Sequence, residues 1–364
     1  MLFQSIWQHH KVQRFKKRLQ SFSDYFPAIF FVGGFAWDAK TFGGEVTMLD
    51  LLILTSYLLI SALILYFLSQ HYADENKYHQ KWIRKILSTN WPYFVLQFLF
   101  GTLLNVLFVL YFKSTGHILA WLMTLSLGII LVATEHFKDR FREFTLSWAL
   151  FSFCTMMLFN FLIPFLIGSI NAAWFYISTL LGTVLAYSLY LKTPNHLGSI
   201  KPVWCISMIL MLAYAFDVIP PVPLVKREIA VGYMLKKVGD DYLLSQQPSS
   251  WWIFWRKTSD DLQVDSGQRI YCFSSVSAPE GLKARLFHVW QHHDKESGWQ
   301  TMSRVGFTLS GGRYNGFRGY TFKSDLQAGD WKVRVVTENN KTVAVQEFTV
   351  RNEHSNLIPI VQKY

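Results

Sequence analysis

The residues best suited to bind a ligand lie close together near the C-terminal end of the sequence, in the segment GGRYNGFRGY at residues 311–320. Arg313 and Arg318 can each hold a phosphate or carboxylate through paired hydrogen bonds. Tyr314 and Tyr320 can stack on a sugar ring, and the glycines allow a ligand to approach the backbone closely. No Gly-Lys-Ser/Thr follows, so the segment is not a nucleotide-binding P-loop.

A second interpretation of this segment is structural, with a tight glycine-shaped connection whose arginines pair with Asp325 or Asp330. His288 and Trp290, in a nearby predicted strand, complete the candidate ligand-binding set. The cluster of His288, His292 and His293 does not predict a metal site. A strand does not assemble such a cluster on one face, and no acidic or cysteine partner stands at a known ligand spacing. No cofactor is predicted.

No catalytic constellation is recognisable in the sequence. Serine, aspartate and histidine all occur, but no nucleophile elbow or comparable hydrolase motif accompanies them. The three cysteines, Cys154, Cys205 and Cys272, leave no pair for a disulfide in the C-terminal part. A tryptophan-rich patch at 251–255 suits membrane contact, glycan stacking or a strand in the core.

The composition predicts that much of the chain lies in a membrane. Only 16% of the residues are charged and 51% are hydrophobic, whereas a soluble domain carries about 25% charged residues. These values also exclude a disordered chain, which is polar and poor in aromatic residues. A helix needs about 20 apolar residues to cross a bilayer. Seven segments meet that need, at about 24–42, 50–70, 91–112, 117–137, 144–168, 171–191 and 201–219.

The basic residues predict the orientation of these helices. Of the 16 Lys and Arg residues before Pro220, 14 fall in the N-terminal segment and in alternate loops. Basic loops stay cytoplasmic, so the N-terminus is predicted inside and everything after Pro220 outside. The basic stretch 11–18 also has a nucleic-acid interpretation, but a topogenic signal explains it and no nucleic-acid partner is predicted. The predicted parts are a cytoplasmic N-terminus at 1–23, a transmembrane domain at 24–219, a proline-rich linker at 220–225 and a periplasmic domain at 226–364.

Polar residues inside the predicted helices are functional candidates by default. Asp38 and Asp217 fall near the outer ends of the first and last helices, where either a substrate site or contact with water explains them. The asparagines among the weaker candidates also fit interhelical hydrogen bonds. These weaker candidates are Asn105, Glu135, His136 and Asn160.

After Pro220 the sequence changes to short alternating segments typical of strands separated by turns. Their spacing predicts an antiparallel β-sandwich, and Asn339-Asn340 suits a hairpin turn between the last two. The stretch 226–258 fits either early strands or a short helix at the membrane surface. The predicted strands are 269–276, 284–291, 301–309, 319–323, 331–337 and 343–350.

Several segments carry a family resemblance. They are YCFSSVSAP at 271–279, HVWQ at 288–291, GGRYNGFRGYT at 311–321 and GDWKVRV at 329–335. With GFAWD at 34–38 and IPPVP at 219–223, they resemble a family of bacterial membrane proteins whose C-terminal domain is known as domain of unknown function 2914. The resemblance implies an inner-membrane protein with a periplasmic β-domain. It implies no established activity and no catalytic residues.

Two functions are consistent with these patterns. The first is a non-enzymatic envelope protein, in which the bilayer holds the helices and the periplasmic β-domain binds a glycan, a lipid headgroup or a protein. The alternative is a membrane transporter or lipid-processing enzyme with Asp38 and Asp217 at an outward-facing site. The first depends on residues such as Arg313 and Arg318, whereas the second requires the two carboxylates to converge on one cavity.

Overall fold

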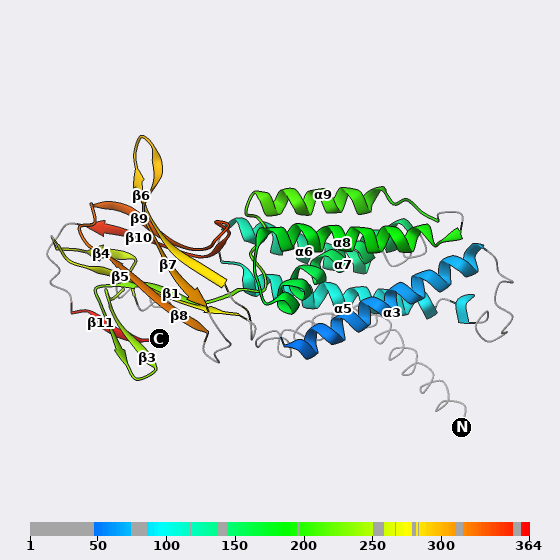
Figure 1. Cartoon of the computed structure of the whole chain (residues 1–364), viewed down its shortest axis with the longest axis horizontal. Helices are drawn as coiled ribbons and strands as arrows, with labels where there is room; N and C mark the ends of the chain where they lie inside the picture. Colours follow the sequence, from blue (N-terminus) through cyan, green and yellow to red (C-terminus); the bar gives the residue numbers. More distant parts are fainter. Residues whose placement is uncertain are drawn as a thin grey trace, which may run out of the picture. The chain divides into compact units, whose positions relative to one another are not determined.

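The computed structural model describes residues 47–73, 86–89, 91–116, 118–136, 144–194, 197–249, 258–265, 267–278, 282, 284–309, 316–351 and 358–364. Within these residues a group of α-helices comes first along the chain and a β-rich region follows (Figure 1). This order agrees with the two parts predicted from the sequence.

Six α-helices lie in the described residues: α3 Met48–Ala73, α5 Trp91–Ser114, α6 Ile118–His136, α7 Phe144–Ile167, α8 Ala172–Leu191 and α9 Lys201–Ala215. Four of them, α3, α5, α7 and α8, are long and apolar enough to cross a membrane. Six of the seven segments predicted from the sequence therefore contain a helix. The remaining segment, 24–42, lies outside the described residues.

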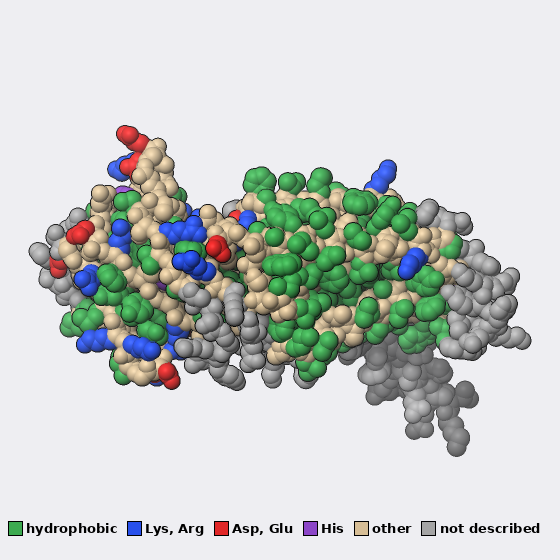
Figure 2. All heavy atoms as spheres, viewed as in Figure 1, with side chains coloured by type: hydrophobic (Ala, Val, Ile, Leu, Met, Phe, Trp, Pro, Cys, Tyr) green, Lys and Arg blue, Asp and Glu red, His purple; other side chains and the backbone are tan. Residues whose placement is uncertain are grey.

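α7 is the central helix of this group, because α3, α5, α8 and α9 all contact it. Hydroxyl groups on the helices bond mainly within their own helix, as Thr155 Oγ1 does to the carbonyl oxygen of Phe151 at 2.6 Å. Such bonds satisfy a polar side chain without help from a neighbouring element. Hydrophobic side chains cover much of the visible surface of the helices (Figure 2). The exposed ones include Leu59 and Leu180. This surface suits an apolar surrounding.

Eleven strands lie in the described residues: β1 Val225–Gly232, β2 Met234–Val238, β3 Asp241–Gln246, β4 Asp261–Gln263, β5 Ile270–Ser277, β6 Ala284–Asp294, β7 Gly298–Leu309, β8 Phe317–Lys323, β9 Gly329–Thr337, β10 Thr342–Arg351 and β11 Ile360–Lys363. They form three sheets. The first sheet has the order β1-β5-β8, the second β4-β10-β9-β6-β7 and the third β11-β3-β2. All neighbours pair antiparallel except β4 and β10, which are parallel.

The six predicted strands are confirmed as β5 to β10, with ends that differ by a few residues. The predicted turn at Asn339-Asn340 joins β9 to β10, and Asn340 has a φ of 60°, which asparagine tolerates better than most residues. The stretch 226–258, left open between strands and a helix, holds most of β1 and all of β2 and β3 in its described part. β4 and β11 span only three and four residues, too few to show alternation.

The first and second sheets share one hydrophobic core. Cys272 of β5 lies in the same cluster as Trp290 of β6 and Trp331 of β9, and both indole rings are at most 1% exposed. The third sheet packs on the opposite face of the first, where Leu244 meets Phe273. β5 is therefore covered on both faces, which explains why nearly all its side chains are buried instead of alternating.

Candidate functional site

The structure separates the predicted ligand-binding residues into two groups. His288 and Trp290 lie on β6, and both side chains are fully buried. Arg318 and Tyr320 lie on β8, where Tyr320 is 49% exposed. The members of the predicted set that lie outside the described residues are Arg313 and Tyr314. The four described residues do not form one site, since a ligand on Tyr320 does not reach the buried pair.

His288 bonds to two hydroxyl groups inside the core. Its Nε2 lies 2.7 Å from Ser274 Oγ on β5, and its Nδ1 lies 2.9 Å from Thr321 Oγ1 on β8. Trp290 Nε1 donates to the same Thr321 oxygen at 3.0 Å. His288 and Trp290 are two residues apart on one strand, so they share a face and meet the inner face of the first sheet. Each polar ring atom of this network has a partner, as burial requires.

Ser274 and His288 have the separation of a nucleophile and its general base, but their surroundings argue against hydrolysis. Ser274 is 1% exposed and His288 is 0% exposed, so a substrate does not reach them. The second ring nitrogen of His288 faces the Thr321 hydroxyl where a triad would place a carboxylate. Burial lowers the pKa of His288 to about 3, which makes the ring a weak base at neutral pH. The network therefore belongs to the core.

The exposed candidates belong to a larger group on the outer face of the first sheet, which we call the aromatic–basic face. The register of β5 and β8 places Tyr271 opposite Phe322 and Phe273 opposite Tyr320. The third sheet covers Phe273, whereas Tyr320 and Phe322 each remain 49% exposed. Two residues of the adjoining third sheet, Lys237 and Tyr242, border this face, and the ring of Tyr242 lies 6.1 Å from that of Tyr320. The aromatic–basic face comprises these two residues with Arg269, Tyr271, Arg318, Tyr320 and Phe322.

Three cations border the rings of this face. The guanidinium carbon of Arg269 lies 4.9 Å from the ring centroid of Phe322, and Lys237 Nζ lies 5.7 Å from that of Tyr242. Arg318 donates to the carbonyl oxygen of Asp240, a contact that holds its guanidinium beside the third sheet. Cations supply charge to an anionic ligand and aromatic faces supply apolar contact. This combination suits an anionic molecule that also carries rings or CH-rich faces.

Asp217 lies at the end of α9 and completes a Schellman motif there. Its φ is 60°, its N–H donates to the carbonyl oxygen of Tyr214 at 3.1 Å, and the N–H of Val218 donates to that of Ala213 at 2.9 Å. These are the two backbone bonds that close a helix whose C′ residue is left-handed. Aspartate accepts this conformation more readily than most residues.

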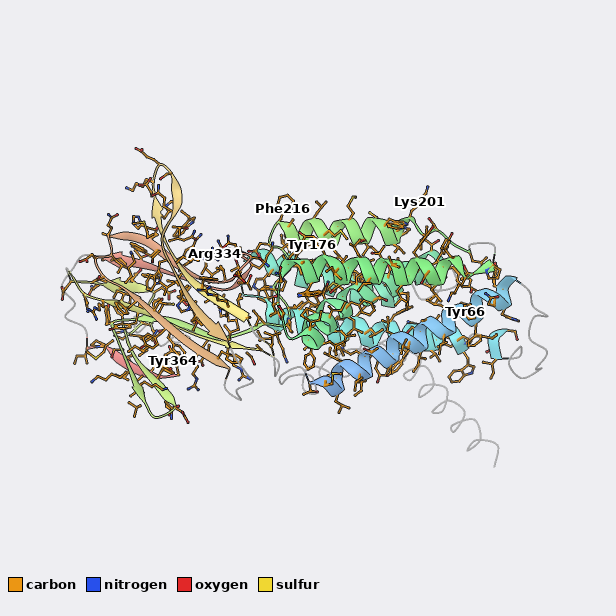
Figure 3. The ribbon with its side chains drawn as sticks, viewed as in Figure 1. Tyr66, Tyr176, Lys201, Phe216, Arg334 and Tyr364 are labelled. Atoms are coloured by element: carbon orange, nitrogen blue, oxygen red, sulfur yellow. The ribbon has the colours of Figure 1, made fainter. Side chains whose placement is uncertain are left out.

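The carboxylate of Asp217 binds the start of β10. It accepts hydrogen bonds from the Thr342 backbone N–H at 3.2 Å and from Thr342 Oγ1 at 2.6 Å. Arg334 of β9, labelled in Figure 3, lies 3.6 Å away and completes the contact. The other predicted carboxylate, Asp38, lies outside the described residues. Asp217 thus has protein partners that account for its charge.

The turn between β9 and β10 contacts the same helix end. Lys341 is 9% exposed, and its Nζ donates to the carbonyl oxygens of Tyr214 and, at 3.2 Å, Ala215. A cation is favourable here because the last carbonyls of a helix carry partial negative charge. Burial lowers the pKa of Lys341, and the nearby Asp217 carboxylate opposes that shift.

Gly116, which follows α5, also meets β10. A Cβ at this position would lie 1.7 Å from the carbonyl oxygen of Val343, so only glycine permits the approach. Asn339 Nδ2 donates to Asn171 Oδ1, next to the start of α8, at 2.9 Å. We call this set of contacts between the helices and the β9–β10 hairpin the junction. Its described members are Gly116, Asn171, Asp217, Arg334, Asn339, Lys341 and Thr342.

The remaining candidates from the sequence have structural surroundings or lie outside the described residues. Asn105 and Asn160 are buried on α5 and α7. In the described part of the chain, no three His, Cys, Asp or Glu side chains are placed to hold a metal ion. Burial raises the pKa of the Cys272 thiol and leaves it inert. The side chains of Glu135 and His136 and the patch at 251–255 are not among the described residues.

Comparison with solved structures gives matches of low similarity. An immunoglobulin-like protein from Pseudomonas aeruginosa matches with 10% identity and a TM-score of 0.21, over 34% of this chain and 98% of that one. A β-glucosidase from Listeria innocua, solved with gluconolactone, matches with 11% identity and a TM-score of 0.19, over 32% of this chain and 16% of that one. An alkylpurine DNA glycosylase from Pseudomonas fluorescens, solved with DNA, matches with 11% identity and a TM-score of 0.20, over 83% of this chain and 97% of that one.

Comparison with protein families gives a match in the β-rich region. No curated protein sequence matches the chain. The family "Protein of unknown function (DUF2914)" matches residues 283–350. This range runs from β6 into β10 and holds the buried His288 and Trp290, the exposed Tyr320 and most of the junction hairpin. Residues 283–350 thus match DUF2914, the family that the sequence resembles.

Proposed function

We propose that this protein is a multi-pass membrane protein whose β-rich region binds an anionic saccharide of the cell envelope on the aromatic–basic face. The observation that carries the proposal is the pair of half-exposed rings, Tyr320 and Phe322, set among cations on a sheet face. Large apolar rings left exposed beside charge are typical of binding surfaces.

The helices support the membrane part of the proposal. α5 and α7 have 24 residues each, which gives a length of about 36 Å against a hydrocarbon core of about 30 Å. Counting α6, α9 and the segment 24–42 with the four longest helices gives seven crossings. With basic loops inside, seven crossings put the N-terminus in the cytoplasm and the β-rich region in the periplasm. The bilayer is then the first partner of the chain.

The β-rich region supports the binding part. We interpret its first and second sheets as a sandwich, because their inner faces share the core around Cys272, Trp290 and Trp331. The buried His288 network ties the same two sheets together. A face on such a rigid framework holds its side chains in place before a ligand arrives, which lowers the entropy cost of binding.

The side chains of the face favour an anionic saccharide over a neutral one. Arginine pairs with carboxylate and phosphate groups in a bidentate manner, and Arg269 and Arg318 stand beside the two exposed rings. Aromatic faces contact the CH groups of sugar rings. A neutral glycan would contact only the rings, and a simple polyanion would contact only the cations. The proposed ligand contacts both the rings and the cations.

Binding can be measured on the full chain in nanodiscs of zwitterionic lipid with three labelled polymers: dextran sulfate, neutral dextran and polyphosphate. We expect dextran sulfate to bind most tightly. The double variant Tyr320→Ala/Phe322→Ala and the variant Arg318→Gln should each weaken it by about tenfold. The matched control is Lys332→Gln with Trp299→Ala, because Lys332 Nζ stacks 3.9 Å from the Trp299 ring elsewhere on the β-rich region. Equal loss in test and control variants would contradict the proposal.

The orientation has its own test. A cysteine at Lys295, in the turn between β6 and β7, should react with a membrane-impermeant maleimide added to intact spheroplasts, and a cysteine at Lys192, after α8, should not. The native cysteines are replaced by serine in both variants. Labelling of the second site alone would reverse the proposed topology.

A further inference from the structure

We propose a second binding site, for an uncharged sugar ring, in a polar pocket of about 270 Å³ at the open edge of the first sheet. Five separate parts of the chain build it: β1, β3, the segment before β4, β10 and Tyr364. Its lining residues are Ile229, Ala230, Val231, Gln246, Thr258, Ser259, Asp260, Gln346 and Tyr364. This site shares no lining residue with the aromatic–basic face.

The polar groups of the pocket are already held in position. Gln246 is 5% exposed, and its Nε2 donates to the carbonyl oxygen of Val231 at 3.0 Å. The Tyr364 hydroxyl lies 2.5 Å from Gln246 Oε1. Across the pocket, Gln346 Nε2 donates to Asp260 Oδ1 at 2.9 Å. A ligand therefore meets fixed amide, carboxylate and phenol groups, which is the arrangement that gives specificity in small-molecule sites.

The ring of Tyr364 is fixed as firmly as its hydroxyl. The ring, labelled in Figure 3, lies 5.3 Å from that of Phe273. The backbone of Tyr364 pairs with that of Tyr242 through two hydrogen bonds. Burial, with the Glu228 charge, raises the pKa of Tyr364 to about 12. The phenol thus remains protonated at neutral pH and donates a hydrogen bond.

The charge of the lining selects the class of ligand. The lining residues include one carboxylate, Asp260, and no lysine or arginine. The lining offers no cationic side chain to a phosphate or carboxylate ligand, whereas hydroxyl groups can donate to the carboxylate and bond to the amides. A single carboxylate is too few for a dedicated calcium site, which takes six to eight oxygens. An uncharged, hydroxyl-rich ligand satisfies these groups best.

The volume fits one ring. At roughly 30 Å³ for each water, the pocket has the volume of about nine waters, which is enough space for one hexose ring. It is near the lower end of ligand pockets, which measure about 300–1,000 Å³. We infer that it accommodates one monosaccharide or the terminal unit of a neutral glycan.

The test uses the full chain in phosphatidylcholine nanodiscs, because maltoside detergents carry sugar headgroups. Glucose, galactose and N-acetylglucosamine are added separately at about 10 mM, and saturation-transfer-difference NMR records contact with the protein. We expect a signal from at least one sugar. Gln346→Leu and the isosteric Asp260→Asn should each reduce its affinity by about tenfold. Gln300→Leu, an amide in β7 far from the lining, is the matched control.

The outcomes separate this site from the proposed function. Tyr320→Ala/Phe322→Ala should leave the sugar signal unchanged, whereas loss of it would assign the signal to the aromatic–basic face and overturn the inference. No signal from any of the three sugars also overturns it, as does equal binding by Asp260→Asn and the unmodified chain. If Gln346→Leu does not yield a monodisperse protein, Asp260→Asn decides, because it preserves the shape and the acceptor of the Gln346 bond.

Discussion

The helical and β-rich regions bury polar side chains in different ways. In the helices, Thr155 and Thr179 bond to carbonyl oxygens of their own helix at 2.6 and 3.0 Å. In the β-rich region, Thr321 bonds to His288 and Trp290, more than 30 residues away in sequence. A helix thus carries its satisfied polar groups with it, which suits an apolar surrounding. The β-rich core keeps its polar groups satisfied only while its sheets stay together.

The largest effect is expected where the two regions meet. Gly116→Ala places a Cβ against the Val343 carbonyl, so the hairpin must shift, at a cost of about 3 kcal/mol, the upper part of the usual range for overpacking. Thermal unfolding and the rate of proteolysis at 219–224 would both report the change. Gly101→Ala is the control, since a Cβ there meets nothing within 4 Å. Equal behaviour of the two variants would show that the junction is not closely packed.

One substitution made in both regions tests the difference directly. Thr321→Val keeps the side-chain shape but leaves Nδ1 of His288 and Nε1 of Trp290 each without a partner, and we expect a loss of about 2–3 kcal/mol. Thr155→Val removes a local bond to a carbonyl already in its helix, and we expect a loss below about 1 kcal/mol. Chemical denaturation of both variants in the same nanodiscs compares them. Similar losses of stability in the two variants would contradict the proposed difference between the helical and β-rich regions.

The pH dependence of stability should belong to the β-rich region. The pKa of His288 is about 3 when folded, against about 6.5 in an unfolded chain, so protons favour unfolding. Its contribution is complete above about pH 6.5 and falls by about 1.4 kcal/mol per pH unit toward pH 3. Between pH 7 and pH 5 the loss is about 2 kcal/mol.

Denaturation curves of the unmodified chain and of His288→Phe, recorded across this pH range, measure the effect. The variant has no titrating group at this position, so its stability should fall less on acidification. His292→Gln, a nearby partly exposed histidine on the same strand, serves as the control. Identical pH profiles for the unmodified chain and His288→Phe would rule the mechanism out.

A smaller effect than that of His288 is expected for the charge at the end of α9. Lys341→Met keeps the apolar stem and removes the cation from the Tyr214 and Ala215 carbonyls, at a cost of about 1 kcal/mol. Lys295→Met, in an exposed turn, should change nothing. The thermal midpoints of the two variants are compared with that of the unmodified chain. Shifts of the same size would show that the contact of Lys341 with the end of α9 does not cause the loss of stability.

The sequence allowed much of the fold to be predicted. Six of the seven apolar segments contain helices because length and apolarity alone define them. The strands β5 to β10 were found because turn residues such as Asn339-Asn340 separate alternating runs. β4 and β11 were missed because three or four residues show no period. Whether seven helices cross a membrane and whether the sheets form a sandwich remain predictions.

The candidate site was less predictable, for a physical reason. Alternation shows that His288 and Trp290 share a face of their strand, but it does not show whether that face is covered. The partners that cover it, Ser274 and Thr321, come from two other strands. The polar pocket needs five separated segments, so no local pattern marks it. Arg318 and Tyr320 stand in a dense local motif, which is why the sequence marks them as candidates, and their role in binding stays a prediction.

The Lys341 contact also constrains both the length of α9 and the direction in which the last carbonyl groups of this helix point. Each residue added to a helix lengthens it by about 1.5 Å and turns its end by about 100°. One residue inserted in α9 would therefore swing the Tyr214 carbonyl away from Lys341, and the Asp217 carboxylate away from Thr342. A whole turn would restore the angle but displace the end by about 5.4 Å. An insertion or deletion in α9 would thus require a matching change in the position of the β9–β10 hairpin.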